Sequence, residues 1–247
     1  MSTRRRAFTA LAASTLLALA ACTGGAGDNP ADPFEDYNRW VHRNNLRVDR
    51  AVLRPAARAY DAVTPTLAQH LVGNAFSHAG TVTDLANHVL QGRPRPALRS
   101  LGRLTLNTVL GAGGLLDPAT EFGLPREDTD FGVTLARYGM DEGPYWVLWL
   151  VGPATTRDMI GQTVDLALNP FLWFGVATDR LWLPPASTLG ETVDFRAGNM
   201  PLIDDLLYES DDSYTTLRTI YLQHRRARIA GGETVVEDLP DIFGEGE

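Results

Sequence analysis

The sequence predicts a mainly α-helical protein with a single folded domain, and three observations support this prediction. Apolar residues recur at the spacing of a helix face in most segments between residues 32 and 230. Few stretches show the alternation of apolar and polar residues that marks a half-buried strand. No internal repeat divides the chain. We therefore expect residues 32–230 to form one helical domain.

The N-terminal segment is typical of an exported protein that carries a lipid anchor. Residues 1–21 combine three arginines with a short apolar stretch, as secretory signals do. They end in Leu-Ala-Ala before Cys22, the only cysteine, and this ending looks like a bacterial lipobox. We expect cleavage before Cys22 and acylation of that residue. An ordinary signal peptide and the twin-arginine route suggested by Arg5-Arg6 are the alternatives. Residues 22–31 are expected to form a flexible, lipid-anchored tether.

The first helix of the domain is expected to start at Asp32-Pro33, an N-cap followed by a first-turn proline. Between Phe34 and Tyr60, six arginines are spaced three or four residues apart. At ~100° per residue they share one face, within an arc of roughly 100°. We expect the helix to bend or end near Pro55. The arginines are Arg39, Arg43, Arg47, Arg50, Arg54 and Arg58; Phe34, Tyr37, Val41, Val48 and Val52 lie opposite.

This arginine face has two interpretations. The functional one is contact with phosphate headgroups or with an anionic partner, which the neighbouring lipid anchor favours. The other is a solvated face that pairs locally with Asp36, Asp49 and Asp61.

The following segments continue the helical pattern. A pattern resembling a helix cap, Thr81-x-x-Asp84, suggests that the segment 64–92 holds one or two helices. Residues 111–130 are rich in glycine and proline and are expected to form a loop or break. Further helices are expected over 96–110, 154–168 and 204–229. The tail 231–247 has six acidic residues and no basic one, so we expect it to be disordered.

Four of the five tryptophans lie within residues 146–182. The indole ring favours the boundary between lipid and water, so these residues are candidates for a membrane interface. Packing in a protein core is the alternative. The residues are Trp146, Trp149, Trp173 and Trp182. The apolar run 145–151 beside them is too short to span a bilayer as a helix.

The charge and composition of the chain exclude several function classes. All 22 basic residues are arginines, which excludes sites that require a lysine, such as Walker phosphate loops and Schiff-base enzymes. The net charge of −8 makes nucleic acid a poor partner. The five histidines have no metal-binding spacing. We therefore expect neither a metal, a cofactor nor an enzymatic activity.

Six blocks, in order, resemble the MlaA (VacJ) family of outer-membrane lipoproteins and cover nearly the whole mature chain. The resemblance is carried by Asp32-Pro33-Phe34-Glu35 with Asn38-Arg39, by Leu90-Gln91-Gly92, by the run from Leu106 to Asp117, by Phe131-Gly132-x-Thr134-Leu135 with Tyr138-Gly139 and Gly143-Pro144-Tyr145, by Gly152-Pro153-x-Thr155-x-Arg157-Asp158, and by Ser210-x-Asp212-x-Tyr214 with Arg218, Tyr221, Gln223 and Arg225. The region of Asn45 departs from the family pattern, because an aromatic stretch is expected there.

The resemblance implies a helical ring embedded in the outer membrane around an amphipathic channel. Such proteins draw mislocalised phospholipid from the outer leaflet and pass it to a periplasmic carrier of the MlaC type, which maintains lipid asymmetry. Trimeric porins hold them in place. Thr23 after the anchor implies outer-membrane rather than inner-membrane placement.

Within that framework, the block from Asn107 to Asp117 is a candidate channel wall and hinge. Asn107 and Thr108 offer neutral hydrogen bonds, and glycines permit bending. The candidate residues are Asn107, Thr108, Gly111, Gly113, Gly114 and Asp117. A helix C-cap followed by a turn is the alternative for Gly111–Gly114. Two other functions remain open: a lipid hydrolase using Ser77, His78 and Asp84, and a structural lipoprotein that tethers porins.

Overall fold

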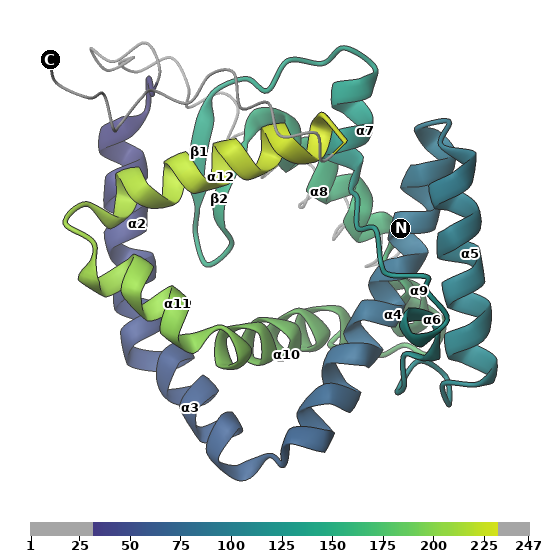
Figure 1. Ribbon diagram of the computed structural model, residues 1–247. Coiled ribbons are helices and arrows are strands. Elements are labelled where there is room, and N and C mark those ends of the chain that lie inside the picture. The colour runs from purple at the N-terminus through teal and green to yellow at the C-terminus, as the bar shows by residue number, and fades with distance from the viewer. Residues whose placement is uncertain (1–31, 232–247) are drawn as a thin grey trace, which may run out of the picture.

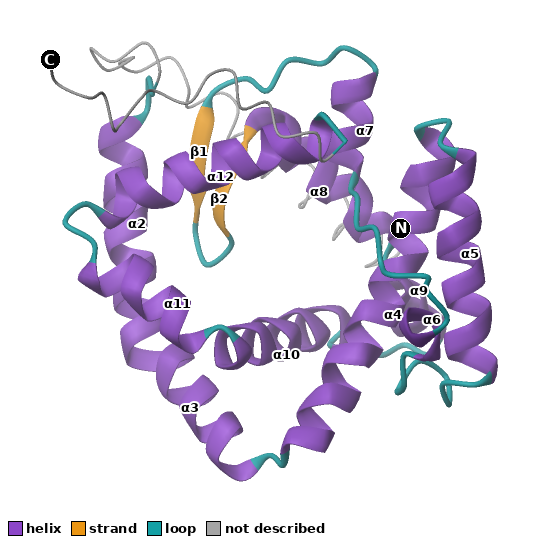
Figure 2. Ribbon diagram, viewed as in Figure 1, coloured by secondary structure: helices purple, strands orange, loops and turns teal. Residues whose placement is uncertain are grey.

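The computed structural model describes residues 32–231 and confirms the mainly helical fold (Figure 2). Its helices follow one another around a ring (Figure 1), and one two-stranded hairpin is the only sheet in the described part of the chain. The signal segment, Cys22, the tether and all of the acidic tail except Gly231 lie outside the described residues. The N-terminal anchor therefore remains a prediction.

The first side of the ring is one long helix with a π-helical turn in its middle. It consists of α2 (Glu35–Val48), η2 (Asp49–Leu53) and α3 (Arg54–Val63). The helix does not end at Pro55 but continues to Val63. The π-helical turn η2 lies just before this proline. Proline lacks the N–H for an i→i−4 bond and crowds the preceding turn, and a π-turn absorbs both effects. The expected bend is thus a local change of helix type.

The next two helices form an antiparallel pair, α4 (Thr66–Leu90) and α5 (Pro94–Val109). The expected cap at Thr81 and Asp84 is wrong, since both residues lie within α4. Thr81 donates its hydroxyl to the Ser77 carbonyl one turn earlier, and Asp84 accepts from Thr129 N at 3.0 Å. Gly92, with φ of 66°, ends the helix in a left-handed conformation that glycine adopts without strain.

A β-hairpin occupies the apolar run that carried no strand signal in the sequence. It pairs β1 (Tyr145–Leu148) with β2 (Gly152–Thr155). The short helices α6 (Pro118–Glu121) and α7 (Phe131–Arg137) precede it. Every residue of β1 is apolar, so the period of two is visible only in burial: Tyr145 and Val147 are buried, and Trp146 and Leu148 are half-buried. The strand could therefore not be predicted from an alternation of apolar and polar residues.

The C-terminal half contains helices that sequence analysis partly missed. The helix α10 was not predicted, and the expected single helix over 204–229 is interrupted at Ser210 between η3 and α12. The elements are α8 (Thr156–Leu168), α9 (Pro170–Ala177), α10 (Leu183–Gly198), α11 (Met200–Asp204), η3 (Asp205–Glu209) and α12 (Ser213–Ile229).

Two helices close the ring between its sides. The helix α10 packs against both α3 and α4, and α12 packs against η3, α7 and β2 (Figure 1). The hairpin lies beside α2, and its turn points toward the space between α12 and α10. The ring therefore brings α2, the hairpin, α10 and α12 together although they are far apart in sequence.

The distribution of apolar side chains is unusual for a water-soluble protein. Within residues 32–231, the apolar core cluster consists of Val41, Tyr145, Val147 and Tyr214, with Tyr221 and Leu222 packed against it. Many large apolar side chains are exposed instead, along almost every helix. No helix of residues 32–231 is long and apolar enough to cross a membrane.

Candidate functional site

A cavity of about 250 Å³ lies where α2, the hairpin, α10, η3 and α12 meet. Most of its wall is apolar: Leu46, Val48, Leu53, Val147, Leu150, Val151, Phe195, Ile203, Leu207 and Leu217. The polar part of the wall consists of His42, Asn45, Asp49, Thr192 and Arg196. The cavity is therefore amphipathic, with charged groups beside an apolar surface.

The charged part of the wall is an ion-pair cluster centred on Arg196, whose side chain is only 2% exposed. The guanidinium of Arg196 donates to both carboxylate oxygens of Asp49, at 3.0 and 3.2 Å, and to Asp204 at 2.5 Å. Arg54 donates to the other oxygen of Asp204, and Tyr208 donates its hydroxyl to Asp49 at 2.5 Å. These contacts join η2 and α3 to α10 and α11.

Arg196 and Asp204 of this cluster keep their charges at neutral pH. Burial raises the pKa of Asp204, but the hydrogen bonds from Arg196 and Arg54 outweigh it and hold the pKa below the usual range. Burial lowers the pKa of Arg196, yet its bonds to Asp49 and Asp204 raise it above the usual arginine value. Burial, followed by the bond to Asp49, raises the pKa of Tyr208 to about 12. The cluster thus combines the charged Arg196 and Asp204 with an undissociated phenol, Tyr208, and its residues Arg196 and Asp49 reach the cavity wall.

The hairpin wall of the cavity is held in place by two asparagines of α2. Asn38 donates to Tyr145 O at 3.0 Å and accepts from Val147 N at 2.8 Å. Two turns later, Asn45 donates to Leu148 O at 2.9 Å and accepts from Leu150 N at 3.0 Å. The side-chain amides therefore pair with the free edge of β1 as a neighbouring strand would.

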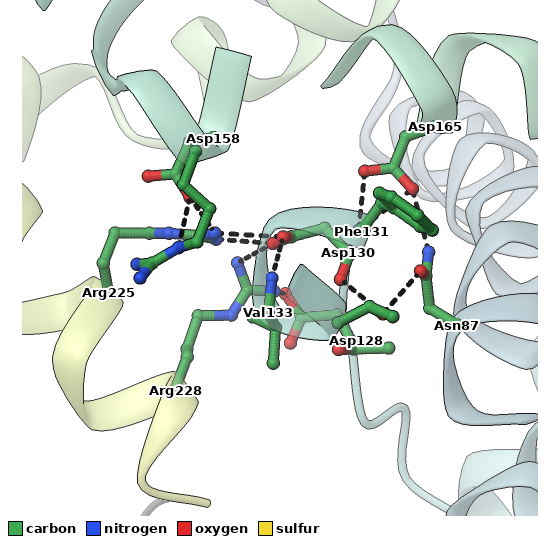
Figure 3. Close-up of polar contacts among 12 residues, drawn as sticks. Asn87, Asp128, Asp130, Phe131, Val133, Asp158, Asp165, Arg225 and Arg228 are labelled. Carbon is green, nitrogen blue, oxygen red and sulfur yellow. Dashed lines mark hydrogen bonds and ion pairs between the residues drawn. The ribbon is translucent and has the colours of Figure 1, made fainter. Parts of the chain in front are cut away.

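A second polar cluster joins α7, α8 and α12 (Figure 3). Arg225 donates to both oxygens of Asp130, at 2.5 and 3.0 Å, and to Asp158 at 2.5 Å. Arg228 contacts Asp130 and Asp128 from the next turn of α12. Burial raises the pKa of Asp130, but the bonds from Arg225 outweigh it and lower the pKa below its usual value. This cluster fixes the C-terminal helix to the ring.

Close contact between α7 and α8 depends on two glycines. A Cβ on Gly161 would lie 2.4 Å from Gly132 N, and one on Gly132 would lie 2.6 Å from Asp158 Oδ1. Both distances are too short for real atoms, so neither position accepts a larger side chain without movement. The Phe131-Gly132 pair of the family-like motif is thereby explained by packing.

The six candidate residues between Asn107 and Asp117 lie in the last turn of α5 and in the turn that leads to α6, and none of them lines the cavity. Asn107 donates to Asp117 at 2.8 Å and accepts from Ala119 N at 3.0 Å. Asp117 also pairs with the buried Arg103 at 2.9 Å. Thr108 contacts His78 at 3.2 Å. The block therefore holds the α5–α6 turn together.

The glycines of that block form a helix end followed by a turn. Gly113 and Gly114 have φ values of 76° and 95°, in the left-handed region. A Cβ on Gly114 would lie 2.4 Å from the His78 ring, and one on Gly111 would lie 2.5 Å from two carbonyl oxygens, whereas Gly113 has open space around it. Only Gly113 therefore needs glycine for its conformation alone.

The arginine face divides into two groups of three. Arg39 pairs with Glu35 and Asp212, Arg54 with Asp204 at 2.5 Å, and Arg58 lies 3.9 Å from Asp204. Arg43, Arg47 and Arg50 are exposed and form no ion pair within residues 32–231. On the opposite side, Val41 is buried, but Tyr37 and Val52 are exposed.

Three of the four candidate tryptophans are exposed. Trp149 is 47% exposed, and Trp173 and Trp182 are each 62% exposed. Trp146 is half-buried, stacks on Phe34 with ring centres 4.2 Å apart, and donates its indole N–H to Thr156. Core packing therefore accounts for Trp146 only.

The residues of the hydrolase alternative do not form a catalytic triad. Asp84 binds Arg126 at 2.7 Å and Thr129 N, while His78 contacts Thr108. Ser77 lies within 3.5 Å of Arg126 instead. Within residues 32–231, no group of three or more His, Cys, Asp or Glu side chains is arranged to hold a metal ion.

Comparison with known proteins supplies the decisive observation. Residues 30–228 match the model of the family described as MlaA lipoprotein. The chain belongs to the MlaA family. Over 92% of its length it is 32% identical to the intermembrane phospholipid transport system lipoprotein MlaA of Haemophilus influenzae, of which 94% is covered. Over 94% of its length it is 31% identical to the Escherichia coli K12 protein of that name, of which 96% is covered.

A solved structure agrees with this assignment. A chain described under "Structural basis for maintenance of bacterial outer membrane lipid asymmetry" superposes with a TM-score of 0.71 at 33% identity, over 81% of this chain and 98% of that one. An uncharacterised protein of Rickettsia felis is also similar, at 33% identity over 83% of this chain and 82% of its own length. The helical ring is therefore the fold of this MlaA-family chain.

The MlaA-like motifs now have structural roles, while the cavity residues were mostly missed. Asn38 binds the hairpin, and Asp158 and Arg225 belong to the cluster of Figure 3. Arg196 and His42 line the cavity, and sequence analysis predicted neither as a binding residue. Arg196 lies in α10, a helix that was not predicted. Asn45 was noted only as a departure from the family pattern.

Proposed function

We propose that this protein moves phospholipid between the outer membrane and the periplasm, removing mislocalised phospholipid from the outer leaflet. The observation that carries the proposal is the amphipathic cavity at the meeting point of the ring's helices, in a chain of the MlaA family. A phospholipid needs a polar path for its headgroup and an apolar one for its tails. The relatives named as intermembrane phospholipid transport lipoproteins support the same role.

In this proposal the cavity is part of an amphipathic channel. Its volume of about 250 Å³ lies just below the ~300–1,000 Å³ of pockets that enclose a whole small ligand. The cavity therefore holds one portion of a phospholipid at a time. The apolar wall at Leu207 and Leu217 suits an acyl chain, while Arg196 and Asp49 offer charged groups at the same wall.

The exposed apolar side chains support placement within a lipid layer. Trp173 and Phe174 on α9 and Leu181 and Trp182 after it are all more than half exposed. Exposed surfaces of this kind mark contact with lipid or another protein. We propose that these aromatic residues, with Trp149, lie at the membrane interface, and that Cys22 carries the lipid anchor on the periplasmic side of the outer membrane.

We further propose that the chain passes lipid to a soluble periplasmic carrier of the MlaC type and is held in place by a trimeric porin. The acidic tail, residues 231–247, has no basic residue and would suit a docking or spacing element on the periplasmic side. A truncation after Ala230 tests the tail: transfer to the carrier falls if the tail docks the carrier and stays unchanged if it does not.

The turn at Gly111–Gly114 remains a proposed hinge for α5 and α6. Substituting both Gly113 and Gly114 with valine is expected to impair lipid removal while leaving anchoring intact. Because valine at Gly114 also collides with His78, the informative variant is Gly113→Val alone, whose site has open space. Unchanged outer-leaflet lipid in the Gly113→Val strain would exclude the hinge.

The proposed function is tested by measuring outer-leaflet phospholipid in a Gram-negative host that lacks its own homologue. Expression of the full-length chain together with its cognate porin and carrier should lower that phospholipid, and Cys22→Ala should abolish the effect. No decrease, with the protein shown to be in the outer membrane, would support a structural role instead. Release of free fatty acid by the purified protein would support the hydrolase alternative.

A further inference from the structure

Three arginines without ion pairs, Arg43 and Arg47 on α2 and Arg50 on η2, form a surface site. Arg43, Arg47 and Arg50 surround a surface hollow of about 370 Å³, whose remaining lining is Leu46 and Ala51. Their spacing of four and three residues places them on one face of the helix. The site therefore presents three guanidinium groups around a small apolar floor.

Two of these arginines are oriented without being neutralised. Arg47 donates to the neutral side chain of Asn44 at 3.0 Å. The guanidinium of Arg50 lies 4.9 Å from the centre of the Tyr208 ring, a cation–π contact. Their positive charges thus remain available to an anion.

The three remaining arginines of the same face, Arg39, Arg54 and Arg58, each have a carboxylate within 3.9 Å. Arg39 and Arg54 bind the carboxylates of Asp212 and Asp204 at 2.9 and 2.5 Å. These contacts tie α2 and α3 to the C-terminal half of the chain. Only the middle of the arginine face is therefore open to a ligand, which separates a binding role from a structural one within a single helix face.

Aromatic side chains next to the site indicate that the anion belongs to a membrane. Trp40, three residues before Arg43, is 49% exposed, and its ring lies edge-on to Trp149 with centres 6.0 Å apart. An exposed Trp beside Arg is typical of the level of lipid headgroups, whereas a freely dissolved phosphate gains nothing from an aromatic surface.

We propose that Arg43, Arg47 and Arg50 bind the phosphate of phospholipid headgroups at the membrane surface and favour anionic phospholipid. Three cations without carboxylate partners gain more from a headgroup with a net negative charge than from a zwitterionic one. This inference rests on the proposed function and adds to it a lipid preference and a location on α2 and η2, where Leu46 is the only lining residue shared with the cavity.

The test uses the full-length protein, purified in a non-ionic detergent and reconstituted in nanodiscs. The nanodiscs contain equal amounts of phosphatidylglycerol and phosphatidylcholine, and the lipid retained through detergent extraction is quantified by mass spectrometry. The variant replaces the three arginines with glutamine (R43Q, R47Q and R50Q). The matched control is R95Q with R137Q and R180Q, which removes three exposed arginines that have no ion pair in the described structure and lie outside α2 and η2.

We expect the wild type and the control to enrich phosphatidylglycerol, and the variant with R43Q, R47Q and R50Q to lose the enrichment. Each arginine is expected to make one such contact with an anionic headgroup. Loss of all three should therefore lower the affinity for phosphatidylglycerol on the order of tenfold to a hundredfold. Added inorganic phosphate at constant ionic strength should leave the enrichment unchanged.

Three results would overturn the inference: equal retention of both lipids by the wild type, an equal loss in the control, or displacement of phosphatidylglycerol by inorganic phosphate. The proposed function has a separate readout, since lipid transport without a lipid preference leaves it intact. If no phospholipid of either class is retained, both the inference and the lipid-binding step of the proposed function fail.

Discussion

Arg196 on α10 donates two parallel hydrogen bonds to Asp49 on the π-helical turn η2, across 147 residues of sequence. Both residues are buried and both line the cavity. The pair therefore joins two sides of the ring and forms part of the wall along which we propose that lipid passes. Its presence makes the stability of the ring and the chemistry of the cavity depend on the same residues.

Replacing Arg196 with methionine should strongly destabilise the protein. The change keeps much of the side-chain volume but leaves the buried Asp49 without its cation. Asp204 loses one of its two arginine partners and keeps Arg54. Breaking a buried ion pair by removing one partner costs about 3–5 kcal/mol. Thermal unfolding of the full-length protein in detergent measures the effect. Arg180→Met, at an exposed arginine, is the control, and an equal fall in Tm for both variants would contradict the role of the pair.

Substituting Gly132 with alanine should also destabilise the protein, by overpacking rather than by loss of charge. The new Cβ would lie 2.6 Å from Asp158 Oδ1 and 2.7 Å from Arg225 Nη2, so the cluster of Figure 3 must move. Overpacking typically costs about 1–3 kcal/mol. Gly198→Ala is the matched control, because nothing lies within 4 Å of its added Cβ. Urea unfolding that is unchanged by Gly132→Ala would show that α7 and α8 separate more easily than the structure indicates.

Asn38→Leu should loosen the β-hairpin while leaving the helices in place. The leucine removes the partners of Tyr145 O and Val147 N, two groups of a buried strand. An unpaired buried polar group costs about 1–3 kcal/mol. Hydrogen exchange of residues 145–155 should become faster, with exchange in α4 and α5 unchanged as the internal control. Equal protection of the hairpin in both proteins would mean that its edge is satisfied in another way.

Stability should decrease in acid, in part because of Asp117. Burial raises the pKa of Asp117, but hydrogen bonds from Thr120, Arg103 and Asn107 outweigh it and hold the pKa at about 2. A carboxyl group with a lowered pKa stabilises the fold above its unfolded value of about 4 and loses this contribution as the pH falls toward 2. The free energy of unfolding should therefore fall between pH 4 and pH 2.

The variant Asp117→Asn isolates that contribution. It should be less stable than the wild type at pH 7, and the difference should shrink as the pH falls from 4 to 2, because the wild type loses its charge there. Asp211→Asn, at an exposed residue, serves as the control. A difference between Asp117→Asn and wild type that stays constant over this range would exclude the ionised carboxylate as the cause.

The elements with a strong helical pattern were the ones that could be predicted from the sequence. The arginine spacing predicted the helix of α2 and α3, and the apolar spacing predicted α5 over residues 96–110. The hairpin could not be found this way, because β1 is apolar at every position and β2 contains Pro153, which disfavours a strand assignment. Long-range pairing with Asn38 and Asn45 of α2 stabilises it instead, and such pairing leaves no local signal.

The candidate site was predicted less completely, for a related reason. The charged residues of its wall are Asp49 and Arg196. They and Asp204, which binds Arg196, belong to elements that meet only in the folded ring. The family resemblance pointed to a channel but assigned its wall to the block around Asn107, which the structure places in the α5–α6 turn. The arginine face was recognised as a unit, while its division into paired and unpaired halves depends on partners more than 140 residues away.

Blocking the cavity chemically tests the central claim most directly. Leu207 lines the cavity, and with Cys22 acylated the variant Leu207→Cys carries a single free thiol. In the complemented host, a bulky maleimide on this thiol should stop lipid removal, so that phospholipid accumulates in the outer leaflet. The same reagent on Asp211→Cys, at an exposed turn, should have no effect. Full lipid removal by a completely modified Leu207→Cys protein would contradict a lipid path through the cavity.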